Sequence, residues 1–182
     1  MLDESIVVGG RAAMRSHCLT RAHASLARNR LAANDRDGAQ ASLQEGLAEA
    51  ARHGHCATCN ALLLPEAVRV ELAFGNVREA EAYAKTLEDV AERFGSRAWT
   101  AMATHARGRV LAARGEADAA FDAFERARGA FEEAGSPYEA ARCVMAQSRL
   151  LEKKAKTKTR ASTLADAARG VLASLGAADL EA

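Results

Sequence analysis

Apolar and polar positions follow a helical period along most of the chain, and the pattern repeats about every 40 residues. Four amphipathic runs each end in a glycine, at spacings of 41, 40 and 41 residues: Gly54, Gly95, Gly135 and Gly176. A glycine directly after a helical run supplies the left-handed backbone that ends the helix. The spacing therefore predicts four repeated units.

A second helical run precedes each glycine-ended run. The predicted first helices are Arg21–Ala33, Leu62–Phe74, Ala101–Arg114 and Arg142–Lys154. Turn signals at residues 34–38, 75–76 and 115–116 separate the two helices of the first three units, and the stretch 153–159 joins the last pair. A single pair cannot bury its apolar face, so neighbouring pairs must stack. We predict an all-α fold, a right-handed α-solenoid of about four helix pairs.

The repeat also predicts the domain boundaries. Residues 17–176 form the helical repeat domain, with units at about 17–54, 55–95, 96–135 and 136–176. Residues 1–16 are a lead-in without a clear pattern, and 177–182 are a short tail. The last helix, at 159–175, carries apolar residues that pack either on the fourth unit or on a second chain, which favours a homodimer.

Two prolines mark local features of the helices. Ser136 and Pro137 predict a helix start, because serine caps a helix and proline fits its first turn. Pro65 lies within the first helix of the second unit and removes a backbone donor. It indicates either a kink or a helix that begins after Leu64.

The third unit carries residues of the tetratricopeptide (TPR) pattern: Gly108 at the small position of its first helix, then Ala120, Phe124 and Ala127 in its second. With a period about six residues longer than usual, residues 17–176 resemble the TPR-like arrays of large bacterial transcription regulators of the LuxR and maltose-regulator type. The resemblance implies an interaction and sensing region in bacterial regulation or signalling. The sequence shows neither a P-loop nor a recognisable helix-turn-helix, so ATPase and DNA-binding activities are not implied.

Composition agrees with helices and restricts the partners. The chain has 45 Ala and 20 Arg, both good helix formers, and 4% aromatic residues. A net charge of +1 argues against nucleic acid as a partner, and the basic run at 153–160 is typical of a solvated loop. Neither a membrane span nor a secretory signal is evident, and four cysteines are too few for a disulfide scaffold. We therefore expect a cytoplasmic protein.

Arginines recur at one position of the repeat, at spacings of 41, 40 and 40 residues: Arg28, Arg69, Arg109 and Arg149. We call them the arginine column. In a TPR-like array this position faces the concave groove, with Arg21, Arg142 and His105 close by. Guanidinium groups bind carboxylates, which favours an acidic peptide or protein segment as the partner. Salt bridges within the repeats, to Glu66, Glu71 or Glu139, are the alternative.

The segment from His53 to Cys59 holds a second group of candidates. A C-x-x-C pair, Cys56 and Cys59, can bind one zinc, with His53 or His55 as further ligands. Cys18 aligns with Cys59 one unit earlier and has His17 beside it, so stacking could bring this second pair close to the first. The alternatives are cysteines and histidines with a structural role, or a redox pair, for which no βαβ context exists.

These patterns favour a non-catalytic protein–protein interaction module over an enzyme. The sequence shows no nucleophile with its base and no cofactor fingerprint, and His105 lacks a partner for acid–base work. The alternative is a regulator stabilised by zinc, or sensing it, through the His53–Cys59 segment. No organic cofactor is expected.

Overall fold

The computed structural model describes residues 2–12, 14–54, 56–152 and 155–177, and all regular elements within these ranges are helical. This confirms the predicted all-α class. In chain order the helices are α1 (Leu2–Gly9), α2 (Arg15–Ala32), α3 (Arg36–Arg52), α4 (Ala57–Ala73), α5 (Val77–Phe94), α6 (Arg97–Ala113), α7 (Ala117–Glu133), α8 (Pro137–Glu152), the 3-10 turn η1 (Ala155–Thr157) and α9 (Lys158–Ser174).

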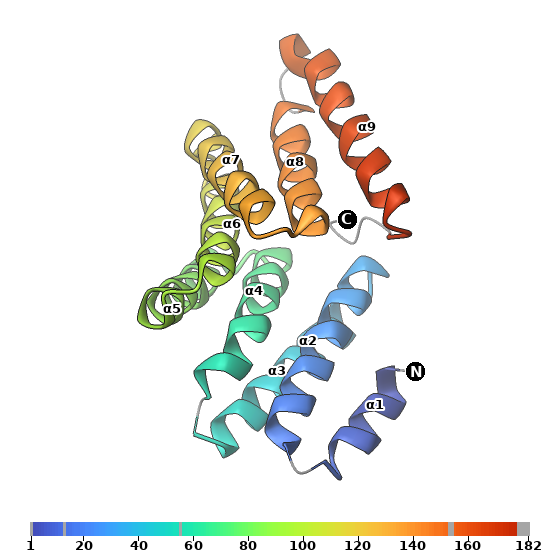
Figure 1. Cartoon of the computed structure of the whole chain (residues 1–182), viewed down its shortest axis with the longest axis vertical. Coiled ribbons are helices and arrows are strands. Elements are labelled where there is room, and N and C mark those ends of the chain that lie inside the picture. Colours follow the sequence, from blue (N-terminus) through green and yellow to red (C-terminus); the bar gives the residue numbers. More distant parts are fainter. Residues whose placement is uncertain (1, 13, 55, 153–154, 178–182) are drawn as a thin grey trace. The chain divides into compact units, whose positions relative to one another are not determined.

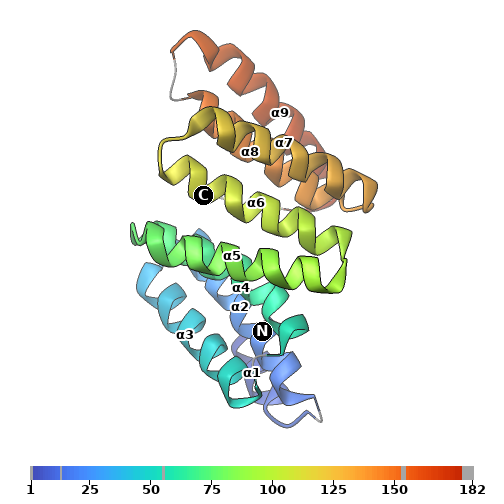
Figure 2. The ribbon, with the colours of Figure 1, turned by 90° about the vertical axis from the view of Figure 1, so that its left-hand side faces the viewer.

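The chain divides into two compact units, Met1–Val90 and Ala91–Ala182, with the boundary inside α5. In the N-terminal unit, α2 packs against α1, α3 and α4, and α3 also contacts α4 (Figure 1). In the C-terminal unit, α6 packs on α7, α7 on α8 and α8 on α9 (Figure 2). Each unit has its own apolar core.

The predicted helix ends are confirmed. Backbone with positive φ follows α3, α5, α7 and α9 at the four glycines of the repeat, with φ between 59° and 73°. The turns inside the first three pairs use the same conformation, at Asn34, Gly75 and Gly115. The left-handed residue ends each helix and changes the direction of the chain.

The predicted helix starts are less accurate. The first helices of the first three units begin four to six residues earlier than the hydrophobic pattern indicated, at Arg15, Ala57 and Arg97. Of these three helices, α6 has a side-chain cap, in which the Ser96 hydroxyl accepts the Trp99 amide at 3.4 Å. Helix α4 runs through Pro65, so a helix that begins after Leu64 is wrong.

Two segments that were expected to lack helix contribute helical turns. Residues 2–9 of the lead-in form α1, and Gly9 lies against Cys18 and Leu19 of α2. Within the expected turn at 34–38, α3 already begins at Arg36, because the Asp35 carboxylate accepts the Gly38 amide at 2.9 Å. The basic stretch is described from Ala155 onward, where η1 leads into α9; its first two residues and tail residues 178–182 lie outside the described ranges.

The last helix, α9, buries only some of its apolar residues. Leu172, with Ala165 and Ala168, packs against Ala141 and Met145 of α8. Val171 and Leu175 are 40% and 46% exposed. Helix α9 therefore packs on α8 with only some of its apolar residues. The sequence had left open whether these residues pack on the fourth unit or on a second chain.

Small residues let the helices of the C-terminal unit approach closely. Gly108 of α6 lies directly under the ring of Phe124 from α7, as its place in the TPR pattern predicted. A Cβ atom at Gly108 would lie only 2.7 Å from Phe124 Cε1. The ring is 2% exposed and enclosed by Ala101, Ala120, Ala127 and Cys143, so it has little room to move.

Replacing Gly108 by alanine should therefore lower the free energy of unfolding of the C-terminal unit by about 1–3 kcal/mol through overpacking. The matched control is Gly129→Ala in α7, where nothing lies within 4 Å of the added methyl. Alanine there should raise stability by about 0.5–1 kcal/mol through helix propensity. Urea unfolding followed by the fluorescence of Trp99 measures both. Equal effects of the two substitutions would contradict the close packing.

Candidate metal centre

Two cysteines stand at the start of α4. Cys56 is the residue that precedes the helix, and Cys59 lies in its first turn, so the C-x-x-C spacing turns both thiols to one end of the helix. Cys59 is 2% exposed, whereas Cys56 is half-buried. The Cys56 sulfur lies 3.1 Å from the Thr58 hydroxyl. The helix start therefore presents one accessible and one enclosed thiol.

Helix α2 completes the cluster from an earlier part of the chain. His17 Nδ1 lies 3.1 Å from the Cys59 sulfur. The ligand atoms of His17, Cys56 and Cys59 all lie within 4.8 Å of one another. The first turn of α2 and the start of α4 thus meet at three side chains that bind soft metals.

The two thiols have opposite acidities. Hydrogen bonds from Thr58 and Cys59 lower the pKa of Cys56 to about 7. Burial, and then the neighbouring Cys56, raise the pKa of Cys59, and a hydrogen bond from Thr20 opposes the shift only in part. The thiolate is the form that binds metal, so Cys56 offers a ligand near neutral pH and Cys59 gives up its proton to an incoming cation.

The donor set fits a tetrahedral metal such as zinc. One imidazole nitrogen and two thiolate sulfurs match the ligands that zinc prefers, and Zn–S bonds of about 2.3 Å place two sulfurs roughly 3.8 Å apart. The observed spread of up to 4.8 Å requires only small side-chain shifts. Three protein ligands leave a fourth position for water or another donor.

The structure gathers a different ligand set from the one expected. Cys56 and Cys59 are in place, but the histidine is His17. His53 instead lies 3.5 Å from a Glu49 oxygen, and His55 lies outside the described residues. The repeat alignment placed the pair Cys18 and His17 at this turn of α2, and of the two it is His17 that reaches Cys59.

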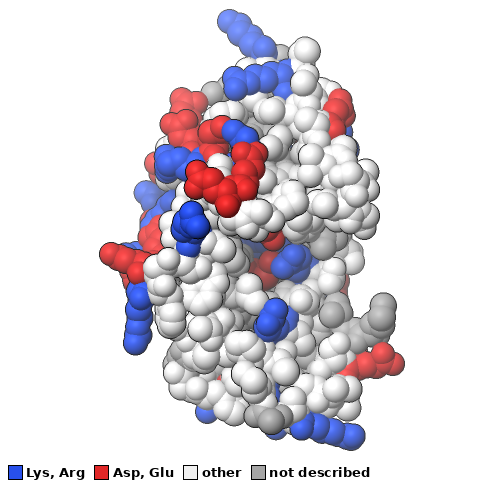
Figure 3. Space-filling view, in the orientation of Figure 1, with Lys and Arg blue, Asp and Glu red and all other residues white. Residues whose placement is uncertain are grey.

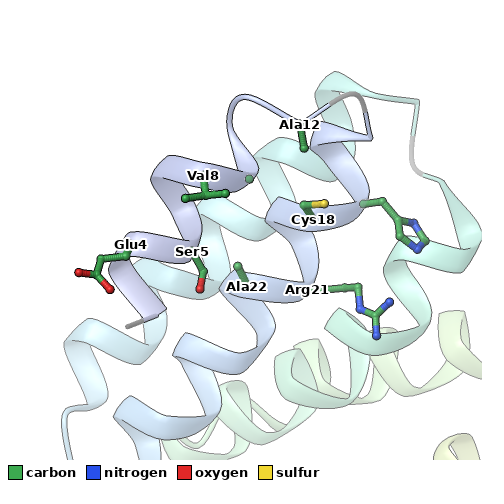
Figure 4. A pocket seen from close by; sticks show the side chains of 9 residues that line it. Glu4, Ser5, Val8, Ala12, Cys18, Arg21 and Ala22 are labelled. Atoms are coloured by element: carbon green, nitrogen blue, oxygen red, sulfur yellow. The ribbon is translucent and has the colours of Figure 1, made fainter.

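Cys18 is exposed and lies on another side of α2. Its Cβ faces Gly9 of α1, and its side chain lines a pocket of about 590 Å³ between α1 and α2 (Figure 4). Consecutive residues on a helix point about 100° apart. Cys18 therefore faces α1, whereas His17 reaches α4.

The buried carboxylate of Glu49 holds helices together near the candidate metal centre of the N-terminal unit. Glu49 of α3 is 3% exposed, and Arg15, the first residue of α2, approaches it to 3.2 Å. Arg52 approaches the same oxygen, Oε1, and His53 lies 3.5 Å from Oε2. Burial opposes ionisation of Glu49, but the hydrogen bonds and charges of Arg15 and Arg52 prevail and hold its pKa below the ordinary value. Glu49 therefore ties the end of α3 to the start of α2.

In the N-terminal unit, two arginines of the column bind one glutamate: Arg69 within its own repeat, as the alternative had it, and Arg28 from the preceding repeat. Arg28 and Arg69 approach opposite oxygens of Glu66 at 3.1 and 2.9 Å. Glu66 is 2% exposed and Arg69 is also buried. These two arginines neutralise a buried carboxylate between α2 and α4. Arg21, two turns earlier in α2, is exposed and lines the α1–α2 pocket.

The candidate groove residues of the C-terminal unit are also largely buried. Arg142 is buried and approaches Glu139 at 2.5 Å. His105 is 6% exposed and lies against Phe124 at 5.3 Å between ring centroids, rather than open to a groove. Arg109 and Arg149 are half-buried. Arg142 and His105 thus lie within the packed structure of the C-terminal unit.

The charges of the described residues show no large patch of one sign on the face in Figure 3, where basic side chains lie among acidic and uncharged ones. Among the described helices, none is both long and apolar enough to cross a bilayer.

Comparison with protein-family models, with curated proteins and with solved structures gives no match for this chain.

The Glu49 cluster makes the stability of the N-terminal unit depend on pH. Because the folded-state pKa is depressed, the stabilisation is complete above the ordinary glutamate value of about 4.3 and is lost as pH falls through the lower folded value. Glu49→Gln should cost about 1–2 kcal/mol at neutral pH and make stability less sensitive to acid. Hydrogen exchange of the α2 and α3 amides measures this loss.

The control for Glu49 is Asp89→Asn. Asp89 pairs with Lys85 at 2.7 Å, but both side chains are about 60% exposed. Its removal should change stability by less than about 0.5 kcal/mol, with an unaltered pH profile. An equal loss of stability in both variants would show that burial does not increase the contribution of Glu49 to the free energy of unfolding.

Proposed function

We propose that this chain is a metal-responsive, non-catalytic helical-repeat module. A zinc ion bound by His17, Cys56 and Cys59 links α2 to α4 and stabilises the N-terminal unit. The observation that carries the proposal is the spread of at most 4.8 Å among three soft ligand atoms from two helices. Chance rarely places a histidine of one repeat on the C-x-x-C pair of the next.

Metal binding of this kind acts on folding. His17 and Cys56 lie at the first turns of helices that are far apart in sequence, and a shared ion fixes these turns to each other. Because the site does not exist in the unfolded chain, the free energy of binding adds to the stability of the folded unit. The response to the metal is thus a change in how firmly α2 and α4 are held together.

The module itself serves protein–protein interaction in this proposal. Its support is the repeat of helix pairs closed by positive-φ glycines, together with the TPR-like contact of Gly108 with Phe124. We propose that the pairs stack as a right-handed solenoid and act in bacterial regulation. A reducing cytoplasm would keep the two thiols available for metal.

The arginine column has a smaller part in this proposal than the sequence suggested. Arg28 and Arg69 contact Glu66, and Arg142 contacts Glu139. Displacing these pairs would expose a buried carboxylate without its partners, which is costly. A protein partner that binds mainly through these arginines is therefore not favoured.

Cobalt(II) titration tests the metal site, because cobalt replaces zinc and its absorption reports thiolate ligands and tetrahedral geometry. We expect one cobalt per chain, with thiolate charge-transfer bands that zinc abolishes. Zinc at 100 times its dissociation constant should stabilise the N-terminal unit by about 2.7 kcal/mol. Thermal unfolding with and without zinc measures this shift.

Matched variants decide which residues bind. Cys56→Ser, Cys59→Ser and His17→Ala should each weaken binding at least tenfold, whereas Cys18→Ser and His53→Ala should leave it unchanged. Circular dichroism confirms that each variant remains helical. Absence of thiolate bands in the native chain, or equal binding by Cys56→Ser, would refute the proposed site.

A further inference from the structure

The pair Cys56 and Cys59 differs from the other cysteines of the chain in being close enough to react together. The two sulfurs lie within 4.8 Å, and only two residues separate them at the start of α4. Cys18 faces α1, and Cys143 is fully buried in the core of the C-terminal unit. Closing the sulfurs to the disulfide length of about 2.05 Å needs only local adjustment of this helix start.

We propose that hydroperoxides convert Cys56 and Cys59 into a reversible disulfide that expels the metal and so removes the metal link between α2 and α4. The inference rests on the proposed metal function, since the same two sulfurs serve as ligands. Oxidation and metal release are then a single event, because a disulfide no longer offers thiolate ligands and His17 alone holds zinc weakly.

The reaction proceeds in two balanced steps. The more accessible Cys56 thiolate attacks the peroxide, the O–O bond breaks, and a sulfenic acid forms while the leaving hydroxide takes a proton to become water. The enclosed Cys59 thiolate then attacks the Cys56 sulfur, forming the S–S bond and expelling hydroxide, which a second solvent proton converts to water. Overall, two thiolates lose two electrons, hydrogen peroxide is reduced to two waters, and one metal ion is released.

The exposure of the two thiols favours this order. Cys56 is half-buried at the helix end and meets a small oxidant first. Cys59, 2% exposed beneath it, is shielded from the oxidant yet next to the sulfur that becomes sulfenic acid. A nearby enclosed thiol captures the sulfenic acid before further oxidation, which keeps the modification reversible.

The test uses the reduced, zinc-loaded full chain and hydrogen peroxide. A chromophoric chelator follows released zinc, and peptide mapping by mass spectrometry locates any disulfide. We expect one Cys56–Cys59 disulfide and one zinc released per chain at matching rates, with both changes reversed by a dithiol reductant and fresh zinc. Cys18→Ser should behave like the native chain, and Cys56→Ser should form no intramolecular disulfide.

The same samples separate failure of this inference from failure of the proposed function. If the chain binds cobalt and zinc but peroxide leaves both thiols reduced, the metal site stands and the switch is overturned. Oxidation of Cys56 to sulfinic acid, or a disulfide through Cys18, also overturns the switch alone. If zinc does not bind in the first place, the proposed function and metal release fail together; peroxide treatment of the metal-free chain then shows whether the dithiol itself reacts.

Discussion

Close approach of helices at small side chains is the constraint on which both units depend. Alanine dominates their cores, as at Ala27 and Ala67 in one unit and Ala120 and Ala127 in the other. Such residues lose little conformational entropy on burial, but each also contributes little apolar area. Stability therefore relies on tight fit and on a few specific polar contacts, which gives the Glu66 and Glu49 clusters more weight than they would have in a core of large residues.

The candidate metal centre follows from the same architecture. A repeat brings the first turn of one helix against the first turn of its counterpart in the next unit, so residues about 40 positions apart become neighbours. His17 and Cys59, 42 positions apart, occupy such a pair of turns. A site built in this way reports on the packing between repeats, whereas a site within one loop would report only on that loop.

Helices and their ends could be predicted from the sequence because both depend on local rules. The hydrophobic period and the glycines at residues 54, 95, 135 and 176 located them, whereas the first turns of α2, α4 and α6 precede the regular part of the hydrophobic pattern and were missed. The cysteine pair was also predicted. His17 was expected near it only together with Cys18, because one residue along α2 changes the direction of a side chain by about 100°, and only the packed structure distinguishes the two.

Cys143 gives the C-terminal unit an internal probe that requires no label. Its side chain is fully enclosed, and burial raises the pKa of its thiol to about 12, so a reagent reaches it only when the core around α8 opens. Under these conditions the alkylation rate of Cys143 is proportional to the population of opened molecules. The alkylation rate of this single thiol thus measures local opening of the C-terminal core, independently of events at Cys56 and Cys59.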